Sequence, residues 1–374
     1  MSEKKKKKGG AQGQPRESWR SRIARELEAE IRQKYRAGAQ LPPESKLAER
    51  FGVSTLTLRE ALAHLAERGL VRREQGRGSF VEDPRASQHL GILNDLDLSS
   101  SLCLSFWLPL TQHLRHYFDG LGYPVHLYMG YIKPGQSLAG RQLSDEFKRD
   151  VDAHRLMGLV VMAGTSLDGC GDKLRKENVP IIGSRESEIK VMIDYRDMYG
   201  RAVEKLHQDG CQRIAVLNWG LSQDAVAEVF DAQGVPFDAD LCYNCQQLHR
   251  LGAGYQEFLD LWDGATEKPD GLFVADEVLF SNVATAILER NIDVPGQLRL
   301  CTHMNDGSRV FSPLPRAEIR VSPEDAAHMV GGLLDRQIRG EQVEPGIRYQ
   351  PLRVVECAGS ARTASYYNRS PRRP

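Results

Sequence analysis

The sequence predicts an α/β protein with a small, mainly helical N-terminal part and a much larger part built on parallel sheets. Two observations lead to this prediction. Up to about residue 83 apolar residues recur at helical spacing, whereas beyond residue 90 short apolar runs alternate with helical patterns. Strands separated by single helices favour parallel pairing through right-handed crossovers. The 374 residues suffice for two or three domains with cores of their own.

Residues 16–83 have the pattern of three helices followed by a hairpin. Apolar residues at every fourth position mark the first helix, and the Pro42–Pro43 pair leads into the second. Ser54 is a good N-cap for the third helix, and the glycines of Gly76–Gly78 permit the positive φ of a tight turn. Residues 84–89 follow as a linker. The predicted elements are the helices Trp19–Tyr35, Glu44–Phe51 and Thr55–Arg68 and the strands Leu70–Glu74 and Ser79–Val81.

This arrangement fits a DNA groove. A helix held by a tight turn on its neighbour lays its N-terminal residues in the major groove, and Arg59 there is suited to reach guanine or phosphate. Lys46 is expected to meet the DNA backbone, and Arg77 at the hairpin tip to enter the minor groove or clamp a phosphate. Singly, such residues are also typical of an exposed helical scaffold; together they indicate DNA binding. The candidate DNA-binding residues are Ser45, Lys46, Ser54, Thr55, Thr57, Arg59, Gly76, Arg77 and Gly78.

Residues 18–81 resemble the winged helix-turn-helix of the GntR family of bacterial transcription regulators. The stretches LPPESKLAERFGVSTLTLREALAHLAERGLV and GRGSFV carry this resemblance. It implies DNA contacts by Thr57, Arg59 and the wing residues. Two positions depart from the family pattern, because Ser45 and Thr55 stand where arginine is common. We therefore expect an operator that differs from those of familiar GntR regulators.

Charge separates the N-terminal part from the rest. Residues 1–88 contain 20 Lys or Arg and 12 Asp or Glu, a net charge of +8. The whole chain has 50 of each sign, so residues 89–374 contain 30 against 38, a net charge of −8. A basic front and an acidic remainder indicate that only the front meets a polyanion.

Targeting patterns favour a cytoplasmic protein. No run approaches the ~20 apolar residues of a membrane helix, and no apolar segment follows Lys4–Lys8 as in a secretory leader. The seven cysteines are scattered, and Cys242–Cys245 is a lone C-x-x-C pair, so we expect reduced thiols without a metal or redox role. Residues 1–15 and 357–374 are expected to form disordered basic tails.

Residues 90–356 exceed the usual complement of one sheet, which predicts two lobes. The predicted strands are Leu90–Leu93, Val125–Met129, Leu159–Met162, Val179–Ile182, Val191–Ile193, Ile214–Leu217, Leu272–Val274, Leu298–Cys301 and Ile319–Val321. The predicted helices are Thr111–Leu121, Ser144–Leu156, Asp197–Asp209, Gly254–Trp262, Asp276–Glu289 and Pro323–Arg339.

The order of these elements resembles the LacI/periplasmic-binding-protein type I domain, as in the arabinose-repressor branch of the GntR family. The resemblance rests on LGILND, IDYRDMYGRAVEKLHQDGCQRIAVLNW, PDGLFVADEVLFSNVATAILERNIDVPGQLRL and IRVSPEDAAHMVGGLLDRQIRG. It implies a two-lobed ligand-binding domain with Rossmann-like parallel sheets. Lobe 1 is expected to comprise about 90–213 and 317–340, and lobe 2 about 214–316 and 341–356.

In such folds the ligand lies between the lobes, at the carboxyl ends of parallel strands. The resemblance places a ligand-binding aspartate at Asp276, whose alternative role is to cap the following helix; capping or loop hydrogen bonds are equally open for the other candidates. Trp219 or Trp107 offers an aromatic face. The chain lacks the family's RxxGF arginine and reads THMNDG where GFDD is usual, so the ligand is expected to differ from a common free sugar, or the response to be reduced. The candidate ligand-binding residues are Asn94, Asp95, Arg185, Asp194, Asn218, Trp219, Asp276, Asn305 and Asp306.

The sequence thus predicts a homodimeric repressor that binds a pseudo-palindromic operator in double-stranded DNA under the control of a sugar or sugar-like effector. It predicts no membrane segment and no cofactor. In the main alternative, the large domain is a degenerate dimerisation module without a ligand. An enzyme is disfavoured, with no catalytic or metal-binding residue assigned, because the histidines are dispersed and H-E-x-x-H, G-x-S-x-G and Walker patterns are missing from the sequence. A transport-type binding protein is disfavoured because it has no use for a DNA reader.

Overall fold

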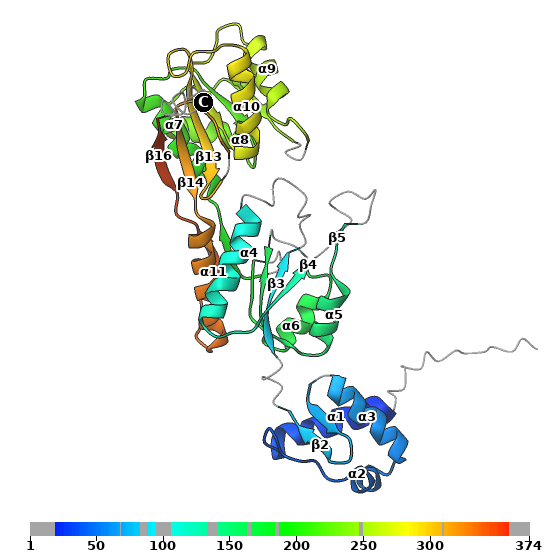
Figure 1. The fold of residues 1–374 in the computed structure, drawn as a ribbon. Helices are drawn as coiled ribbons and strands as arrows, with labels where there is room; N and C mark the ends of the chain where they lie inside the picture. The colour runs from blue at the N-terminus through cyan, green and yellow to red at the C-terminus, as the bar shows by residue number, and fades with distance from the viewer. Residues whose placement is uncertain are drawn as a thin grey trace, which may run out of the picture. The chain divides into compact units, whose positions relative to one another are not determined.

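The structure is a computed structural model, drawn as a ribbon in Figure 1. It describes residues 19–67, 69–82, 88–94, 106–129, 131–132, 141–162, 166–183, 187–246, 250–308 and 310–358. The expected tail 1–15, Asp95, Arg185 and most of the linker 84–89 and of the tail 357–374 lie outside these residues. The chain divides into two compact units, one of residues up to His89 with Glu146–Met157 and one of Leu90–Asp145 with Gly158–Pro374.

The N-terminal described residues form three helices and a two-stranded antiparallel hairpin. The bounds are α1 (Trp19–Lys34), α2 (Glu44–Phe51), α3 (Thr55–Glu67), β1 (Val71–Glu74) and β2 (Gly78–Val81). Their buried side chains meet in one apolar core, to which Leu27 of α1, Leu58 of α3 and Val81 of β2 contribute. Gly52 has φ 63°, a left-handed conformation that ends α2 and turns the chain into α3. The predicted winged helix-turn-helix is therefore present.

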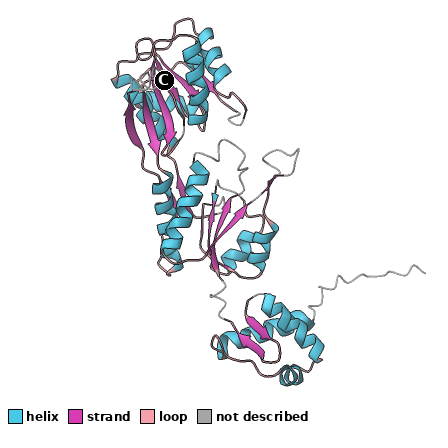
Figure 2. Ribbon diagram, viewed as in Figure 1, coloured by secondary structure: helices cyan, strands magenta, loops and turns pink. Residues whose placement is uncertain are grey.

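The larger part contains two six-stranded sheets, and Figure 2 shows helices on both faces of each. Strands of the first sheet are β3 (His89–Asn94), β4 (Val125–Met129), β7 (Leu156–Val161), β8 (Ile181–Ile182), β9 (Ile189–Met192) and β15 (Gly346–Tyr349). Its order is β15-β9-β8-β7-β3-β4. The helices that accompany it in the chain are α4 (Leu108–Gly120), α5 (Asp145–Asp152), α6 (Cys170–Lys176) and α11 (Pro323–Ile338). A short antiparallel pair, β5 (Tyr131–Ile132) and β6 (Arg141–Gln142), follows β4.

Helices α4 and α11 pack side by side (Figure 1). The ring of Tyr117 meets His328 edge-on at 5.2 Å between centroids, and the Tyr123 hydroxyl donates to Asp335 Oδ1 at 2.7 Å. At Gly331 the backbone approaches Tyr117 so closely that a Cβ atom would lie 2.5 Å from the ring. Glycine is therefore required at this helix crossing.

The second sheet has six strands. Across the sheet they lie in the order β11-β10-β12-β13-β14-β16. They are β10 (Ile214–Asn218), β11 (Cys242–Asn244), β12 (Gly271–Val274), β13 (Arg299–Asn305), β14 (Arg316–Val321) and β16 (Arg353–Cys357). The first five pair in parallel, and β16 runs antiparallel to β14. The helices of this part are α7 (Tyr195–Gln208), α8 (Gln223–Ala232), α9 (Tyr255–Gly264) and α10 (Glu277–Glu289), with a 3-10 turn at Ala239–Leu241.

The two faces of the second sheet carry different helices. Leu272 and Val274 of β12 belong to an apolar core with Phe280 of α10. Phe273 between them packs edge-on against Tyr199 of α7, with 4.9 Å between ring centroids. Because neighbouring residues of a strand point to opposite faces, α10 and α7 cover opposite sides of the sheet. The predicted α/β class with mainly parallel sheets is confirmed.

The sheet order corrects the expected lobe boundaries at three places. Helix α7 packs on β12, β13 and β14, and β14 itself belongs to the second sheet rather than to lobe 1. Strand β15 pairs with β9 in the first sheet rather than in lobe 2. The chain therefore changes sheet after β9, after β14 and after β15. Local periodicity does not reveal these changes, because a strand reads alike in either sheet.

Several elements were missed in the sequence. Helix α8 has Ala225, Val226, Val229 and Phe230 buried at helical spacing, and Ser222 caps it by accepting a hydrogen bond from Ala225 N at 3.2 Å. That pattern was available in the sequence. The elements β11, β15, β16 and α6 are short or lie at sheet edges with exposed side chains, so they carry little periodic information. Among the described helices, none combines the length and apolar content that crossing a membrane requires.

Candidate DNA-reading and ligand-binding sites

The first turn of α3 forms the candidate DNA-reading surface. Ser54 caps the helix, because its Oγ accepts a hydrogen bond from Thr57 N at 3.1 Å. The Thr57 hydroxyl lies 2.9 Å from the same Oγ, so this hydroxyl is engaged with the cap. Thr55 and Arg59 are exposed, as expected. Leu56 is exposed as well and was missed, although its place outside the buried stripe of α3 was visible in the sequence.

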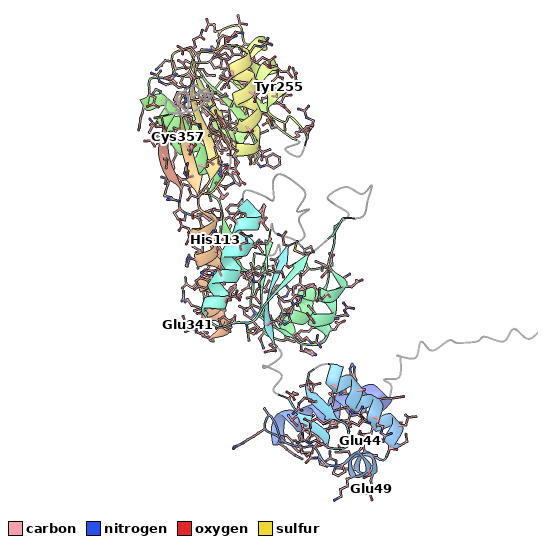
Figure 3. All side chains as sticks on the ribbon, viewed as in Figure 1. Glu44, Glu49, His113, Tyr255, Glu341 and Cys357 are labelled. Atoms are coloured by element: carbon pink, nitrogen blue, oxygen red, sulfur yellow. The ribbon has the colours of Figure 1, made fainter. Side chains whose placement is uncertain are left out.

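Glu44 at the start of α2, labelled in Figure 3, holds two arginines of this surface. Its Oε2 accepts from Arg59 Nε at 2.7 Å and its Oε1 from Arg73 Nη2 at 2.8 Å. Burial raises the pKa of Glu44, but the hydrogen bonds and charges of both arginines outweigh it and hold this pKa below its usual value. Glu44 therefore stays ionised and orients the guanidinium of Arg59. Glu44 is not among the residues predicted from the sequence.

The hairpin forms a basic wing. Gly76 and Gly78 have φ 75° and 114°, which the tight turn requires. Gln40 supports the turn by donating from Nε2 to the backbone oxygen of Arg77 at 2.6 Å. The Arg77 side chain pairs with Glu74 at 2.6 Å and is 74% exposed. The exposed Ser45 and Lys46 lie on α2. The predicted DNA contacts therefore lie on α2, on α3 with its Ser54 cap, or on the wing.

The carboxyl ends of the parallel strands of the second sheet bring polar side chains to one edge. Asn218 ends β10, Asn244 ends β11, Asp276 follows β12 and Asn305 ends β13. The register pairs Asn218 with Asn244, and it aligns the ends of β10 and β12. This edge is where ligands bind in open α/β sheets. Of the predicted ligand-binding residues, it collects Asn218, Trp219, Asp276 and Asn305.

A buried network orders the end of β10. Asn218 is 2% exposed, accepts a hydrogen bond from the Tyr199 hydroxyl and donates to Leu221 O at 2.8 Å and to Asn244. The Tyr199 hydroxyl also accepts from Trp219 N at 2.9 Å and lies 2.8 Å from Trp219 O. Burial raises the pKa of Tyr199 well above its usual value, so its hydroxyl stays protonated. Asn218 and Tyr199 therefore fix the backbone of Trp219, which is half-buried.

Asp276 takes the capping role that the sequence left open. Its Oδ1 accepts a hydrogen bond from Val278 N at 2.8 Å at the start of α10. Burial raises the pKa of Asp276 to about 7, with a smaller contribution of the same sign from Glu277, against the lowering effect of the helix N–H groups. Burial, and then the charge of Asp276, raise the pKa of the Tyr195 hydroxyl. An aspartate that titrates near neutral pH at a strand end is typical of a functional position.

Beside Asp276 lies a buried group that sequence reasoning missed. Glu277 is 1% exposed and accepts from both nitrogens of Asn305, from the backbone N at 2.9 Å and from Nδ2 at 3.0 Å. Within the described residues, Asn305 Oδ1 and His303 Nε2 have no hydrogen-bond partner. Burial lowers the pKa of His303 and Glu277 opposes this shift. Two unpaired polar atoms on alternate residues of β13 are suited to hold water or a polar ligand group.

Other predicted residues have different surroundings. Asp194 caps α7 by accepting from Asp197 N at 3.1 Å. Asp306 pairs with Arg353 and, at 3.4 Å, with Arg320. Asn94 is buried at the end of β3 and belongs to the first sheet, not to this edge.

Cys242 and Cys245 are free thiols in the described structure. Burial raises the pKa of Cys242 to about 11 and that of Cys245 to about 12. Thiols with such pKa values remain protonated and unreactive at neutral pH.

The fold and these surfaces define a class of protein in which a winged helix-turn-helix is joined to a two-sheet domain of periplasmic-binding-protein type. Comparison with known families identifies the parts more closely. Residues 20–81 match the model of bacterial regulatory proteins of the gntR family, and residues 203–357 match the periplasmic binding protein-like domain. The first match covers the winged helix-turn-helix, and the second covers all strands of the second sheet.

The curated relatives match the DNA-binding domain. The probable transcriptional regulator PhnF of Escherichia coli (strain K12) is 52% identical over 59 residues, which are 16% of this chain and 24% of that protein. The HTH-type transcriptional repressor NagR of Bacillus subtilis (strain 168) is 48% identical over 50 residues, 13% of this chain and 21% of that protein. The chain thus matches about a quarter of the length of these relatives or less.

Solved structures share the fold of the larger part. The transcriptional regulator CelR–cellobiose complex superposes with a TM-score of 0.56 at 17% identity and covers 85% of this chain and 100% of that one. A regulatory protein of the LacI family from Chloroflexus aggregans gives 0.58 at 16% identity and covers 73% and 98%. Likeness at this identity concerns the fold alone.

Proposed function

We propose that this chain is a transcription regulator whose binding to an operator is controlled by a small-molecule effector. The observation that carries the proposal is the polar edge of the second sheet, where Asp276, Asn305 and Trp219 supply a carboxyl, an amide and an aromatic face. Such an edge on a chain that carries a GntR-type reader fits a sensor with a DNA output. The chain acts by binding in the cytoplasm and not as an enzyme.

The reader contacts DNA through α2, α3 and the wing. Arg59 and Thr55 face the major groove, Lys46 and the N-terminus of α3 meet phosphate, and Arg77 reaches the backbone or the minor groove. A homodimer presents two readers and therefore binds a pseudo-palindromic operator. Repression is supported by the name of the relative NagR, which is a transcriptional repressor.

The effector is a polyhydroxylated molecule such as a sugar. Carboxylate and amide oxygens accept from hydroxyl groups, and the indole of Trp219 packs against the apolar face of a sugar ring. The CelR structure, which is a complex with cellobiose, supports this class. Asp306 pairs with Arg320 and Arg353 and serves to hold the strand ends rather than to bind the effector.

Operator selection followed by an effector screen tests the proposal. The full chain is used to select sequences from random duplex DNA, and release of the selected operator is then measured by fluorescence anisotropy with sugars, sugar phosphates and nucleosides. We expect a hit to raise the thermal midpoint of the wild type and to change its operator affinity.

The matched variant is Asp276→Asn, because asparagine still caps α10. It should bind the operator like the wild type and lose the response to the effector. Failure to enrich any DNA sequence contradicts the DNA function. An operator without any responding compound points instead to the degenerate dimerisation module, and a full response in Asp276→Asn removes Asp276 from the site.

A further inference from the structure

One large apolar side chain lies exposed on the reading surface. Leu56 is 66% exposed, and it is the one large apolar side chain that is exposed among the residues of 22–82 whose burial the structure describes. The core of this domain is complete without it, because Leu58, Leu62 and Leu65 of the same helix are fully buried. Leu56 therefore contributes little to folding, and its exposure calls for another explanation.

The position of Leu56 directs it toward DNA. It is the second residue of α3 and lies next to the cap formed by Ser54. The first turn of a recognition helix is the part that enters the major groove. Arg59 lies three residues further along and shares its helix face. Glu44 holds Arg59 at 2.7 Å, so the side chain beside Leu56 is itself oriented.

The chemistry of Leu56 selects one partner in the groove. A leucine side chain has neither a donor nor an acceptor, and the only apolar group that a base pair presents in the major groove is the C5 methyl of thymine. The hydroxyl of Thr57 is engaged with the Ser54 cap, which leaves less hydrogen-bonding capacity on this turn. Contact with a methyl group would remove the exposed leucine from water without leaving a base edge unpaired.

We propose that Leu56 is a specificity-determining residue that contacts the C5 methyl of a thymine in each half-site of the operator. The proposal rests on the proposed DNA-binding function and adds the base that this position reads. It predicts a conserved thymine in the operator at the place that faces the first turn of α3.

Replacement of thymine by uracil tests the contact directly, since uracil pairs alike and lacks only the methyl group. The operator is first selected with the full chain, and each thymine in both half-sites is then replaced in turn. In each half-site we expect one thymine whose replacement raises Kd about fourfold, which is the effect of one buried methyl group. For Leu56→Ala, the ratio of the Kd for the uracil-containing operator to the Kd for the thymine-containing operator should fall to about one at that position. At the other positions this ratio should stay as in the wild type.

Two controls separate reading from folding. Alanine is a good helix former, so Leu56→Ala should keep the thermal midpoint of the wild type. Leu251→Ala makes the same change at a leucine that is 99% exposed in the second unit, and it should keep the full uracil effect.

An operator in which no thymine is sensitive to uracil overturns the inference, as does a sensitivity that persists unchanged in Leu56→Ala. Failure to select any operator would instead contradict the proposed function.

Discussion

Replacement of Asp276 by asparagine should make the stability of the ligand-binding domain less dependent on pH. Burial raises the pKa of Asp276 from its ordinary value of 3.8 to about 7. Below pH 3.8 the carboxyl is protonated in the folded and in the unfolded chain. Between about pH 4 and pH 7 the folded chain keeps a proton that the unfolded chain has released, so the free energy of unfolding falls as pH rises. Above pH 7 the loss is complete.

The magnitude follows from the pKa difference. Each pH unit within this window changes the free energy of unfolding by at most about 1.4 kcal/mol, which gives about 3 kcal/mol between pH 5 and pH 7. Asp276 is half-buried, so solvent screening reduces the effect, and we expect about 2 kcal/mol. Asp276→Asn keeps the cap and has no charge to bury. When the pH rises from 5 to 8, the free energy of unfolding of the variant should therefore increase by about 2 kcal/mol relative to that of the wild type.

Urea unfolding followed by tryptophan fluorescence at pH 5 and pH 8 measures this difference. Trp219 and Trp262 both pack against the core of the second sheet and report its transition. Asp276→Ser, which also caps a helix without charge, should behave like Asp276→Asn. A stability difference between variant and wild type that is equal at both pH values would refute the raised pKa, because all other titrating groups are shared and cancel.

Three further substitutions, the last with a matched control, test other parts of the structure. Arg59→Ala should weaken operator binding by ~1–3 kcal/mol in an anisotropy titration if Arg59 reads a base; an unchanged Kd removes that role. Tyr199→Phe deletes the buried hydroxyl that ties the end of β10 together and should lower the free energy of unfolding by about 1–3 kcal/mol. Gly331→Ala should destabilise the chain by about 1–3 kcal/mol, because the new Cβ would lie 2.5 Å from the ring of Tyr117. Gly332→Ala, with its nearest neighbour at 3.6 Å, should be neutral or slightly stabilising, and equal melting temperatures for both variants would contradict the packing argument.

Local patterns were sufficient for the fold class and for most elements of the winged helix-turn-helix. The buried stripe of α3, the Ser54 cap and the left-handed Gly52 are each determined by residues close in sequence. Sheet membership is not determined locally. Strand β14 pairs with β13 and β16, and only the tertiary structure decides that it closes the second sheet before the chain continues into α11.

The same distinction applies to the candidate site. Asp276 was identified through the family resemblance, which implies an aspartate at this strand end, and its alternative role as a helix cap is visible in the sequence. Glu277, one residue further, was overlooked, since its role depends on Asn305, which lies 28 residues away. Glu44 was overlooked for the same reason, because its two arginine partners come from α3 and β1. Pairs that are remote in sequence are the part of a site that a single sequence does not disclose.

The chain crosses from the second sheet to the first sheet at this same polar edge. Strand β14 ends at Val321, and Ser322 caps the following helix α11 by accepting from Asp325 N at 3.1 Å. Strand β16 begins at Arg353, which pairs with Asp306 directly after Asn305. In a parallel sheet all strands leave at their carboxyl ends, so ligand-facing residues and crossover segments necessarily share one edge. An effector held by Asp276 and Asn305 would therefore act next to the segments that join the two sheets, without any separate relay through the core.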